Sequence, residues 1–359
     1  MRAAIFRNGD IVAGELADPV PSAGQVLVKT LACGICGSDL HAAKHAHRMV
    51  DVSVRMTGKP RFDLKRDVVF GHEFVCEVID HGPQTTKAVK PGTRVCSIPV
   101  MRIPDGITGV GYSNDFPGGY GERMVLTEPF LIPVPNGLSS DLAALTEPLA
   151  VGMHAVEMAH ITGDEVPLVI GCGPVGLAVI AALKLKKIGP IVAADYSPTR
   201  RTLAKRMGAD VVIDPARTSA YATWTQHAAL PPDAKPTAPI MGSQVLTKPA
   251  LVFECVGVPG VLQQIFEGVP RGARIVVVGV CMEPDKTEPM FGISKELNVQ
   301  YVLGYTPDEF ARSLQLIAEG KVDVAPLITG KVGIDGVKGA FEELGNPERH
   351  TKILVEPWR

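Results

Sequence analysis

The stretch that decides the fold is VPLVIGCGPVGLAVIAALKLKK, residues 166–187. An apolar run leads straight into a turn that carries Gly171, Gly173 and Gly176, and a long apolar run follows. In such a turn the first glycine allows a tight bend, the second lets the backbone approach a pyrophosphate, and the third allows a helix to pack closely on the strand. The spacing predicts a strand, a phosphate-binding turn and a helix, although a glycine turn in another kind of α/β protein can have the same letters.

The chain after this stretch alternates between strand-like and helix-like segments. The segment SPTRRTLAKRMG predicts a helix with Ser197 as its N-cap, Pro198 in its first turn and Gly208 just past its end. Further apolar runs predict strands at 191–195, 211–213, 250–257 and 274–279. Such alternation is typical of a doubly wound parallel sheet. A stretch rich in Pro, Ala and Thr, at 230–249, predicts a surface loop inserted in this domain.

One acidic residue indicates which dinucleotide the domain binds. Asp195 lies at the end of the second strand, nineteen residues after Gly176. A carboxylate there accepts hydrogen bonds from ribose hydroxyls and repels a 2′-phosphate, which favours NAD, while Arg200 and Arg201 leave NADP open as a minor alternative. The predicted cofactor-binding residues are Gly171, Gly173, Pro174, Val175, Gly176, Asp195, Arg200, Val256 and Val278.

The segments on either side of this domain have a different pattern. Before it, short β-rich runs are separated by turns rich in proline and glycine, which predicts an irregular barrel or sandwich. These runs lie at 25–30, 74–80 and 121–126. After it, Thr306 and Glu309 predict a capping box before a helix that ends at Gly320, and a second helix over 337–344 precedes a terminal strand, KILVEP.

A second group of residues has the chemistry of a metal site. Cys33 and Cys36 form a Cys-x-x-Cys pair, which alone could be half of a structural zinc site, a redox pair or two small core residues. Downstream, His72 and Glu73 follow Gly71, which would let the backbone turn and expose them. One thiolate, one imidazole and one carboxylate are ligands of a catalytic zinc that keeps a position open for water or substrate.

Composition and charge exclude several classes of function. The 359 residues contain 36 Lys and Arg against 38 Asp and Glu, for a net charge of −2, whereas nucleic-acid binding needs a basic excess. No apolar run approaches the roughly 20 residues that span a bilayer. The seven cysteines are odd in number and scattered, unlike a secreted disulfide framework. We expect a cytoplasmic protein with reduced thiols and no nucleic-acid or membrane partner.

Five segments resemble, in order along nearly the whole chain, the zinc-containing medium-chain alcohol and polyol dehydrogenases. They are CGICGSDLH at 33–41, GHEF at 71–74, TEPLAV at 146–151, GCGPVGL at 171–177 and a segment that starts YTPDEF at 305. The resemblance implies an α/β fold, with a GroES-like β-rich catalytic domain over 1–147 and 301–359 and a Rossmann domain over 148–300. It implies hydride transfer between NAD and a small-molecule alcohol/carbonyl pair, in which the alcohol could be a secondary alcohol, a polyol or a bulky primary alcohol.

The resemblance also assigns the metal ligands. In the family, the cysteine before the Gly-Ser-Asp segment and the histidine of the Gly-His-Glu segment bind the catalytic zinc, which corresponds to Cys36 and His72 here. The third protein ligand is Glu73 or Glu147, because polyol-type relatives have a glutamate where other members have a cysteine, and Glu73 also counts as a catalytic candidate. We therefore expect one catalytic zinc per chain.

Further roles follow from the same resemblance. The family's proton relay of hydroxyl, cofactor ribose and imidazole corresponds to Ser38 and His41, which could otherwise be a turn hydroxyl and a solvent-facing helix residue. Asp39 would orient His72 or the local backbone. Relatives pair the last strand of the dinucleotide sheet across a two-fold axis, and VQYVLGY at 299–305 is a candidate edge strand. This implies a homodimer or homotetramer.

Two segments depart from the commonest family pattern. Many members hold a structural zinc with four closely spaced cysteines, but no cysteine lies between Cys96 and Cys172 here. We expect no structural zinc and a lobe over 100–121 that is held by packing alone. The segment 42–67 looks longer than in most relatives and has seven Lys or Arg against three Asp. It could cover the substrate cleft and favour a bulky or anionic substrate, or be a solvated loop or a subunit contact.

Two other functions remain open on the sequence alone. A zinc-free reductase of the same superfamily, acting on quinones or activated alkenes, would lack the ligands at Cys36 and His72, so these residues argue against it. A non-catalytic NAD-binding structural protein would need neither the ligands nor the relay residues.

Overall fold

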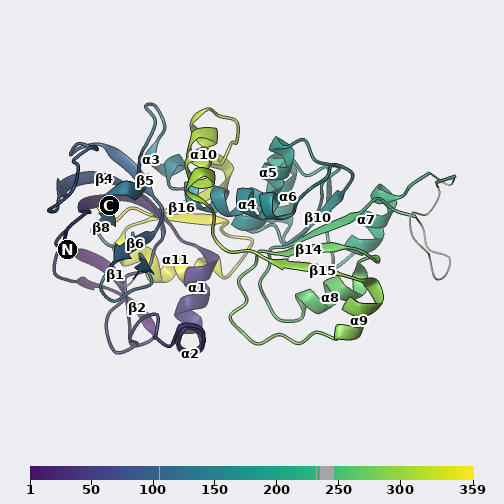
Figure 1. The fold of residues 1–359 in the computed structure, drawn as a ribbon, viewed down its shortest axis with the longest axis horizontal. Helices are drawn as coiled ribbons and strands as arrows, with labels where there is room; N and C mark the ends of the chain where they lie inside the picture. The colour runs from purple at the N-terminus through teal and green to yellow at the C-terminus, as the bar shows by residue number, and fades with distance from the viewer. Residues whose placement is uncertain (105, 232, 235–245) are drawn as a thin grey trace. The chain divides into compact units, whose positions relative to one another are not determined.

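The computed structural model describes residues 1–104, 106–231, 233–234 and 246–359, and the chain divides into two compact units. Unit 1 comprises Met1–Pro148 and Thr306–Arg359, and unit 2 comprises Leu149–Tyr305. The yellow C-terminal segment therefore joins the purple and blue N-terminal segments in unit 1 (Figure 1). Most of the loop predicted at 230–249 lies outside the described residues. No helix within the described ranges combines the length and the apolar character that a membrane span requires.

Unit 2 is built on one sheet of six parallel strands. From one edge to the other these are β12 (Val211–Ile213), β11 (Val192–Ala194), β10 (Val166–Ile170), β13 (Ala250–Glu254), β14 (Arg274–Val277) and β15 (Asn298–Tyr301). The strand order reverses after β12, because the chain builds one half outward from β10 and then returns to build the other. The predicted doubly wound parallel sheet is confirmed.

Helices connect the strands of unit 2. They are α5 (Pro174–Leu185), α6 (Pro198–Met207), α7 (Ala220–Ala228), α8 (Val261–Gly268) and α9 (Pro289–Lys295), whereas α4 (Thr146–Met158) precedes β10 and begins in unit 1. Helix α6 has the predicted ends, because the Ser197 side chain accepts a hydrogen bond from the Arg200 backbone N–H and Gly208 adopts a φ of 118°. Trp224 of α7 donates to the Val166 carbonyl at 2.8 Å, which ties this helix to β10 in the core of the unit.

Two of the three motif glycines are needed for β10 and α5 to pack together. Gly171 has a φ of 91°, which L residues rarely adopt. A Cβ on Gly176 would lie 1.9 Å from the Gly171 carbonyl oxygen, so no side chain fits there. A Cβ on Gly173 would meet only the end of the Arg200 side chain, 3.9 Å away, and its φ of −68° suits any residue. The fold therefore requires Gly171 and Gly176 but not Gly173.

Unit 1 contains a seven-stranded sheet around β3 (Gln25–Gly34). The strands paired with β3 are β4 (Glu73–His81), β8 (Arg123–Thr127) and β17 (Lys352–Val355), all antiparallel to it. The remaining strands are β5 (Arg94–Ser97), β9 (Leu131–Pro133) and β16 (Ile328–Val332). Two hairpins accompany the sheet, β1 (Arg2–Arg7) with β2 (Asp10–Glu15) and β6 (Val100–Ile103) with β7 (Gly106–Gly109).

The helices of unit 1 are short. They are α1 (Gly37–Lys44), α2 (Ala46–Thr57), α3 (Ser140–Ala143), α10 (Pro307–Ala318) and α11 (Val337–Leu344), with 3₁₀ turns at Glu128–Phe130, Ala325–Leu327 and Ile334–Gly336. The predicted capping box of α10 is present, because Thr306 Oγ1 accepts from the Glu309 N–H and the Glu309 carboxylate accepts from the Thr306 N–H.

The register between β3 and β4 brings distant residues together. Gly34, the last residue of β3, pairs with Glu73, the first residue of β4. A Cβ on Gly34 would lie 2.1 Å from Glu73 Oε2, so the glycine leaves room for the carboxylate. Cys36 follows Gly34 as the N-cap of α1, and His72 precedes Glu73. The sheet therefore assembles residues that are far apart in the sequence.

The lobe at 100–121 is held by hydrogen bonds as well as by packing. The Asn114 side chain accepts from the Asp63 N–H at 2.7 Å and donates to the Asp63 and Asp67 carbonyls at 3.0 and 3.2 Å. The expectation that packing alone holds this lobe is therefore wrong, because the basic segment 42–67 supplies polar contacts that were not predicted.

The glycine geometry predicts unequal effects of adding a methyl group in the turn. We expect Gly176→Ala to lower the free energy of unfolding by about 3 kcal/mol, because overpacking of this kind forces the backbone apart. Gly173→Ala is the matched control and should change stability by less than about 0.5 kcal/mol. Urea unfolding of both variants measures this, and equal losses would contradict the account.

Candidate functional site

The turn between β10 and α5 can hold an anion. Helix α5 begins at Pro174 with Gly173 as its N-cap, and Val175 completes the start of its first turn. Backbone N–H groups at such a helix start have no partner inside the helix and favour negative charge. The open space at Gly173 lets a phosphate approach the backbone closely.

Asp195 and Arg200 lie beside this turn. Asp195 accepts hydrogen bonds from the Cys172 N–H at 2.7 Å and from the Ser197 N–H at 2.8 Å, so its carboxylate is held against the turn. The Arg200 guanidinium approaches Gly173, and its buried Nε has no hydrogen-bond partner. A carboxylate and a guanidinium therefore lie beside the turn, where the adenosine half of a dinucleotide would bind next to its phosphates.

Two further predicted cofactor residues follow neighbouring strands. Val256 comes two residues after β13 and Val278 one residue after β14, so both lie at the carboxyl edge of the sheet. Glu254 links them, because its carboxylate accepts from the Val256 N–H at 2.7 Å and its carbonyl accepts from the Val278 N–H at 2.9 Å. Burial raises the pKa of Glu254. The structure thus brings the turn, Asp195 and both valines to one edge of the sheet.

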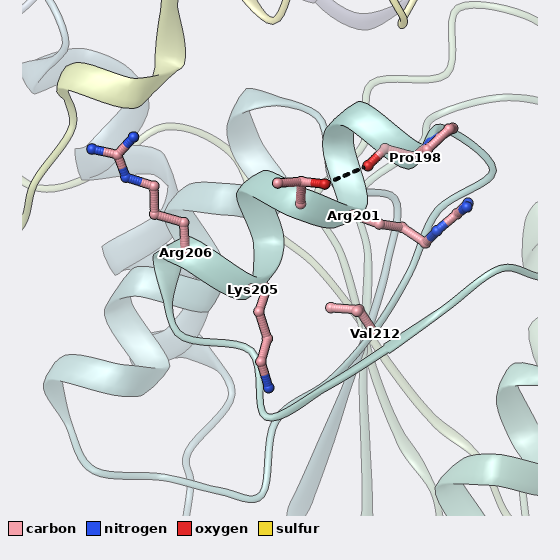
Figure 2. A pocket seen from close by; sticks show the side chains of 6 residues that line it. Pro198, Arg201, Lys205, Arg206 and Val212 are labelled. Atoms are coloured by element: carbon pink, nitrogen blue, oxygen red, sulfur yellow. Dashed lines mark hydrogen bonds between the residues drawn. The ribbon is translucent and has the colours of Figure 1, made fainter.

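A surface hollow of about 620 Å³ lies along α6 (Figure 2). Its lining residues are Pro198, Arg201, Thr202, Lys205, Arg206 and Val212. Arg201 donates to two backbone carbonyls of its own segment, and Lys205 donates to the Asp210 carbonyl at 2.8 Å. Figure 2 shows Arg201 and Arg206 pointing to opposite sides. Because these charges do not converge, we assign no ligand to the hollow.

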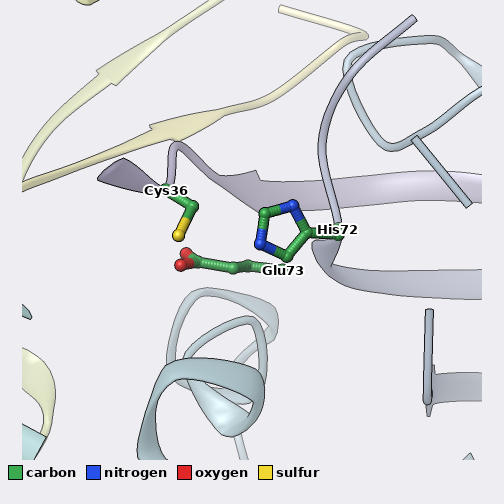
Figure 3. Close-up of side chains that lie close together, drawn as sticks. All are labelled: Cys36, His72 and Glu73. Carbon is green, nitrogen blue, oxygen red and sulfur yellow. The ribbon is translucent and has the colours of Figure 1, made fainter. Parts of the chain in front are cut away.

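Three potential metal ligands lie together in unit 1. One ligand atom from each of Cys36, His72 and Glu73 lies within 4.8 Å of the other two, and Figure 3 shows the three side chains converging. His72 and Glu73 are only 9% and 1% exposed. The expectation that Gly71 exposes them is therefore wrong: its φ of 102° does turn the chain, but toward the interior. Cys33 is not in the group and packs in the core.

Asp39 faces His72 from within the protein. Its Oδ1 lies 3.2 Å from His72 Nδ1. The Tyr112 and Tyr120 hydroxyls donate to its two oxygens at 2.7 and 2.6 Å, and the Cys36 N–H donates to it at 3.1 Å. Because Nδ1 faces a carboxylate, Nε2 is the ring nitrogen left for a metal. Asp39 therefore lies where it can orient His72, although Nδ1 makes no hydrogen bond in this geometry.

Glu73 belongs to a buried ion pair that the sequence did not predict. Lys352 Nζ donates to both Glu73 oxygens, at 2.7 and 2.6 Å, and to the Ile35 carbonyl at 3.0 Å. Both side chains of the pair are 1% exposed. Burial would lower the pKa of Lys352, but the negative charge of Glu73 raises it, and the net shift is upward. Lys352 is therefore a fixed positive charge beside the group.

The charges around the three potential ligands fit a divalent cation. Burial and the Glu73 carboxylate raise the pKa of the Cys36 thiol, so a thiolate needs a nearby cation. Burial would lower the pKa of His72, whereas Asp39 and Cys36 raise it, with a net upward shift. With Cys36 as thiolate and His72 neutral, the negative charges of Cys36, Asp39 and Glu73, with Glu147 nearby, exceed the one positive charge of Lys352. A net negative charge therefore remains, which a Zn²⁺ ion would offset.

Ser38 and His41 lie on one face of α1, three positions apart. Ser38 Oγ is 3.0 Å from the Tyr112 hydroxyl oxygen. The His41 ring stacks near that of His45, with 6.4 Å between centroids. Both predicted relay residues therefore follow Cys36 directly on the helix that it caps.

Glu147, at the start of α4, is outside the group of three ligands found among the described residues. It is 8% exposed, and its negative charge acts with that of Glu73 to raise the pKa of Lys352. Glu147 is therefore near enough to the buried ion pair to interact with it electrostatically.

Comparisons with known proteins agree with both halves of this description. Residues 22–136 match the alcohol dehydrogenase GroES-like domain, and residues 174–319 match the zinc-binding dehydrogenase family. The (R,R)-butanediol dehydrogenase of Bacillus subtilis is 30% identical, over 99% of this chain and all of that protein. The sorbitol dehydrogenase of Bos taurus is 28% identical, over 93% and 90% of the two chains.

The solved structures agree as well. The crystal structure of 2R,3R-butanediol dehydrogenase from Bacillus subtilis matches with a TM-score of 0.78 and 28% identity over 99% of each chain. The chain belongs to the zinc-containing medium-chain alcohol and polyol dehydrogenases. It is an oxidoreductase that acts on an alcohol/carbonyl pair with a nicotinamide cofactor.

Three residues around the candidate metal site were missed by reasoning from the sequence. Lys352 stands in an apolar terminal strand, and a lysine at that place is a signal of a buried partner, because an unpaired buried charge is costly. Tyr112 and Tyr120 lie in the lobe at 100–121, whose sequence predicts only turns. No pattern in the sequence points from them to Asp39, because the contact is made between segments more than 70 residues apart.

The Glu73–Lys352 pair predicts a large effect of a single substitution. Lys352→Met should lower the free energy of unfolding of the metal-free protein by about 3–5 kcal/mol, because it leaves a buried carboxylate unpaired. Added zinc should raise the melting temperature more in this variant than in the wild type, since the metal replaces the lost positive charge. Thermal and urea unfolding with and without zinc measure both effects.

The matched control is Lys338→Met, which removes the exposed partner of Asp10. An exposed pair contributes about 0–1 kcal/mol. Equal losses in the two variants would mean that the buried pair does not stabilise unit 1.

Proposed function

We propose that this dehydrogenase holds one catalytic zinc through Cys36 and His72, with Glu73 or Glu147 as the third protein ligand. The observation that carries the proposal is the convergence of a thiol, an imidazole and a carboxylate within 4.8 Å. Glu73 already shares its charge with Lys352, which makes it a weak ligand that water, substrate or Glu147 can replace. We expect no structural zinc.

The zinc, when bound, supplies a Lewis acid that lowers the pKa of the substrate hydroxyl. The other tasks belong to side chains of this chain. Asp39 holds His72 in the orientation for binding, Ser38 accepts the proton of the substrate hydroxyl as it gives up its own, and His41 passes the released proton toward solvent. Lys352 balances the negative charge of Glu73 beside the place where the substrate hydroxyl would bind.

We propose NAD as the preferred cofactor. Asp195 lies beside the phosphate-binding turn, held by the Cys172 and Ser197 N–H groups. A carboxylate in this place favours the free 2′-hydroxyl of NAD over the 2′-phosphate of NADP. The approach of Arg200 to the turn leaves a weaker use of NADP open.

We propose a secondary alcohol of a diol or polyol as the substrate class. The support is the pair of relatives, a butanediol dehydrogenase and a sorbitol dehydrogenase, that align along most of the chain. The basic segment 42–67 offers less support for an anionic substrate than its charge suggested. Arg48 and Arg55 both lie near Asp51, and Arg66 pairs with Asp115.

We also propose a homodimer or homotetramer through β15. This strand is at an edge of the sheet, where its backbone can pair with a second copy. Tyr301 of β15 and Leu303, two residues after it, are exposed apolar side chains. Light scattering should give two or four times the 38.1 kDa chain mass, and a monomer would contradict the proposal. The cytoplasmic location stays a prediction.

One experiment separates this function from its rivals. The purified protein should contain about one zinc per chain and should reduce NAD faster than NADP with butane-2,3-diol or sorbitol. Cys36→Ser should lose at least about a hundredfold in turnover, because the metal provides the main charge stabilisation, while NADH binding measured by fluorescence stays within about twofold.

Each rival has its own outcome. An active protein without zinc would support a quinone or alkene reductase instead. A zinc-loaded protein that binds NADH but oxidises no alcohol would support a structural role. Equal loss of turnover and NADH binding in Cys36→Ser would mean that the cysteine only maintains the fold.

A further inference from the structure

Asp39 determines the direction of two hydrogen bonds. It is fully buried, and its oxygens accept from Tyr112 at 2.7 Å, Tyr120 at 2.6 Å and the Cys36 N–H at 3.1 Å. A carboxylate with donors on both oxygens has no proton of its own to give. Both tyrosine hydroxyls must therefore donate to Asp39.

The direction of the hydrogen bond from Tyr112 to Asp39 fixes the direction of the hydrogen bond between Tyr112 and Ser38. A tyrosine hydroxyl has one proton, and that of Tyr112 is committed to Asp39. Ser38 Oγ lies 3.0 Å from the same hydroxyl oxygen, so in this pair Ser38 must be the donor. Ser38 Oγ can then make a further hydrogen bond only as an acceptor, to a group that is a hydrogen-bond donor.

The Tyr112 ring is held in place by its neighbours. The His72 ring lies 5.4 Å away at 36°, and the Arg61 guanidinium carbon lies 5.2 Å from the ring centroid. Arg61 is in the basic segment 42–67, and cation–π contact of this kind stabilises a fixed ring. With 8% of Tyr112 exposed, the ring has little freedom to release Ser38.

We propose that Tyr112 is a positioning residue that presets Ser38 as a hydrogen-bond acceptor and so favours a bound alcohol over a bound carbonyl. This rests on the proposed role of Ser38 in accepting the alcohol proton. An alcohol O–H donates a hydrogen bond to the Ser38 lone pair. A carbonyl oxygen has no proton to donate, so it faces the same lone pair without forming a hydrogen bond. In oxidation the alcohol O–H bond breaks and its proton bonds to Ser38 Oγ, while one Ser38 O–H bond breaks and gives a proton to the relay that includes His41, so Ser38 stays a neutral hydroxyl. The C–H electron pair leaves with hydrogen as hydride to the nicotinamide.

Removal of the Tyr112 hydroxyl should affect alcohol oxidation and carbonyl reduction differently. Tyr112 stabilises the alcohol complex and the transition state, but not the carbonyl complex. Tyr112→Phe should therefore raise KM for the alcohol about tenfold with little change in kcat, and lower kcat for the carbonyl about tenfold with little change in KM. The two kcat/KM values then fall by the same factor, as the equilibrium constant of the reaction requires.

The test uses the zinc-loaded full chain with butane-2,3-diol and NAD in one direction and acetoin and NADH in the other. Tyr120→Phe is the matched control, because it removes the hydroxyl that donates to the other oxygen of Asp39. We expect the split between KM and kcat in Tyr112→Phe alone. In a Ser38→Ala background, Tyr112→Phe should no longer produce it. The same pattern in both tyrosine variants would overturn the proposal, because it would trace the effect to Asp39.

Two measurements do not depend on turnover. Both tyrosine variants should release zinc to a chelator at rates within about threefold of each other, since each loses one hydrogen bond to Asp39. In a crystal structure of zinc-loaded Tyr112→Phe, the Ser38 side chain should change rotamer or partner; an unchanged Ser38 would contradict its control by Tyr112. A wild-type protein that holds zinc but oxidises no alcohol would contradict the proposed function, and the position of Ser38 would still test this inference.

Discussion

The pairing of Gly34 with Glu73 across β3 and β4 is the constraint on which the rest of the site depends. A slip of one residue in this register would send the Glu73 side chain to the other face of the sheet. The glycine is needed because a Cβ there would lie 2.1 Å from the carboxylate oxygen. A buried carboxylate in turn needs a positively charged partner. Lys352 provides it from β17, the strand that pairs with β3. One strand register thus links the N-terminal, middle and C-terminal segments of unit 1.

The lobe at 100–121 and the basic segment 42–67 are the two segments that depart from the commonest family pattern. They meet at Tyr112. The lobe at 100–121 carries this tyrosine, and Asn114 of the lobe is bound to the backbone of the basic segment. Arg61 of that segment lies over the Tyr112 ring. The hydroxyl of Tyr112 reaches both Asp39 and Ser38. Through Tyr112, the lobe and the basic segment are therefore linked by contacts to Ser38, Asp39 and His72.

The sequence predicted what is local or strictly periodic. The turn at Gly171 and the cap at Ser197 were predictable because each depends on residues a few positions apart. The parallel sheet was predictable because alternating strands and helices leave few other arrangements. The burial of His72 and Glu73 was predicted wrongly, because the direction in which Gly71 turns the chain depends on packing against Tyr120 and Cys33. Lys352 and Tyr112 could not be assigned, since their partners lie far away in the chain.

We propose that a single zinc binds through one sulfur ligand at Cys36, with nitrogen and oxygen ligands completing the shell. X-ray absorption at the zinc edge of the purified holoenzyme tests this most directly. We expect one sulfur at about 2.3 Å and the remaining nitrogen and oxygen ligands at about 2.0–2.2 Å. In Cys36→Ser loaded with zinc, the sulfur contribution should disappear. Two or more sulfur ligands in the wild type, or a sulfur contribution that survives in the variant, would contradict the ligand set proposed for this site.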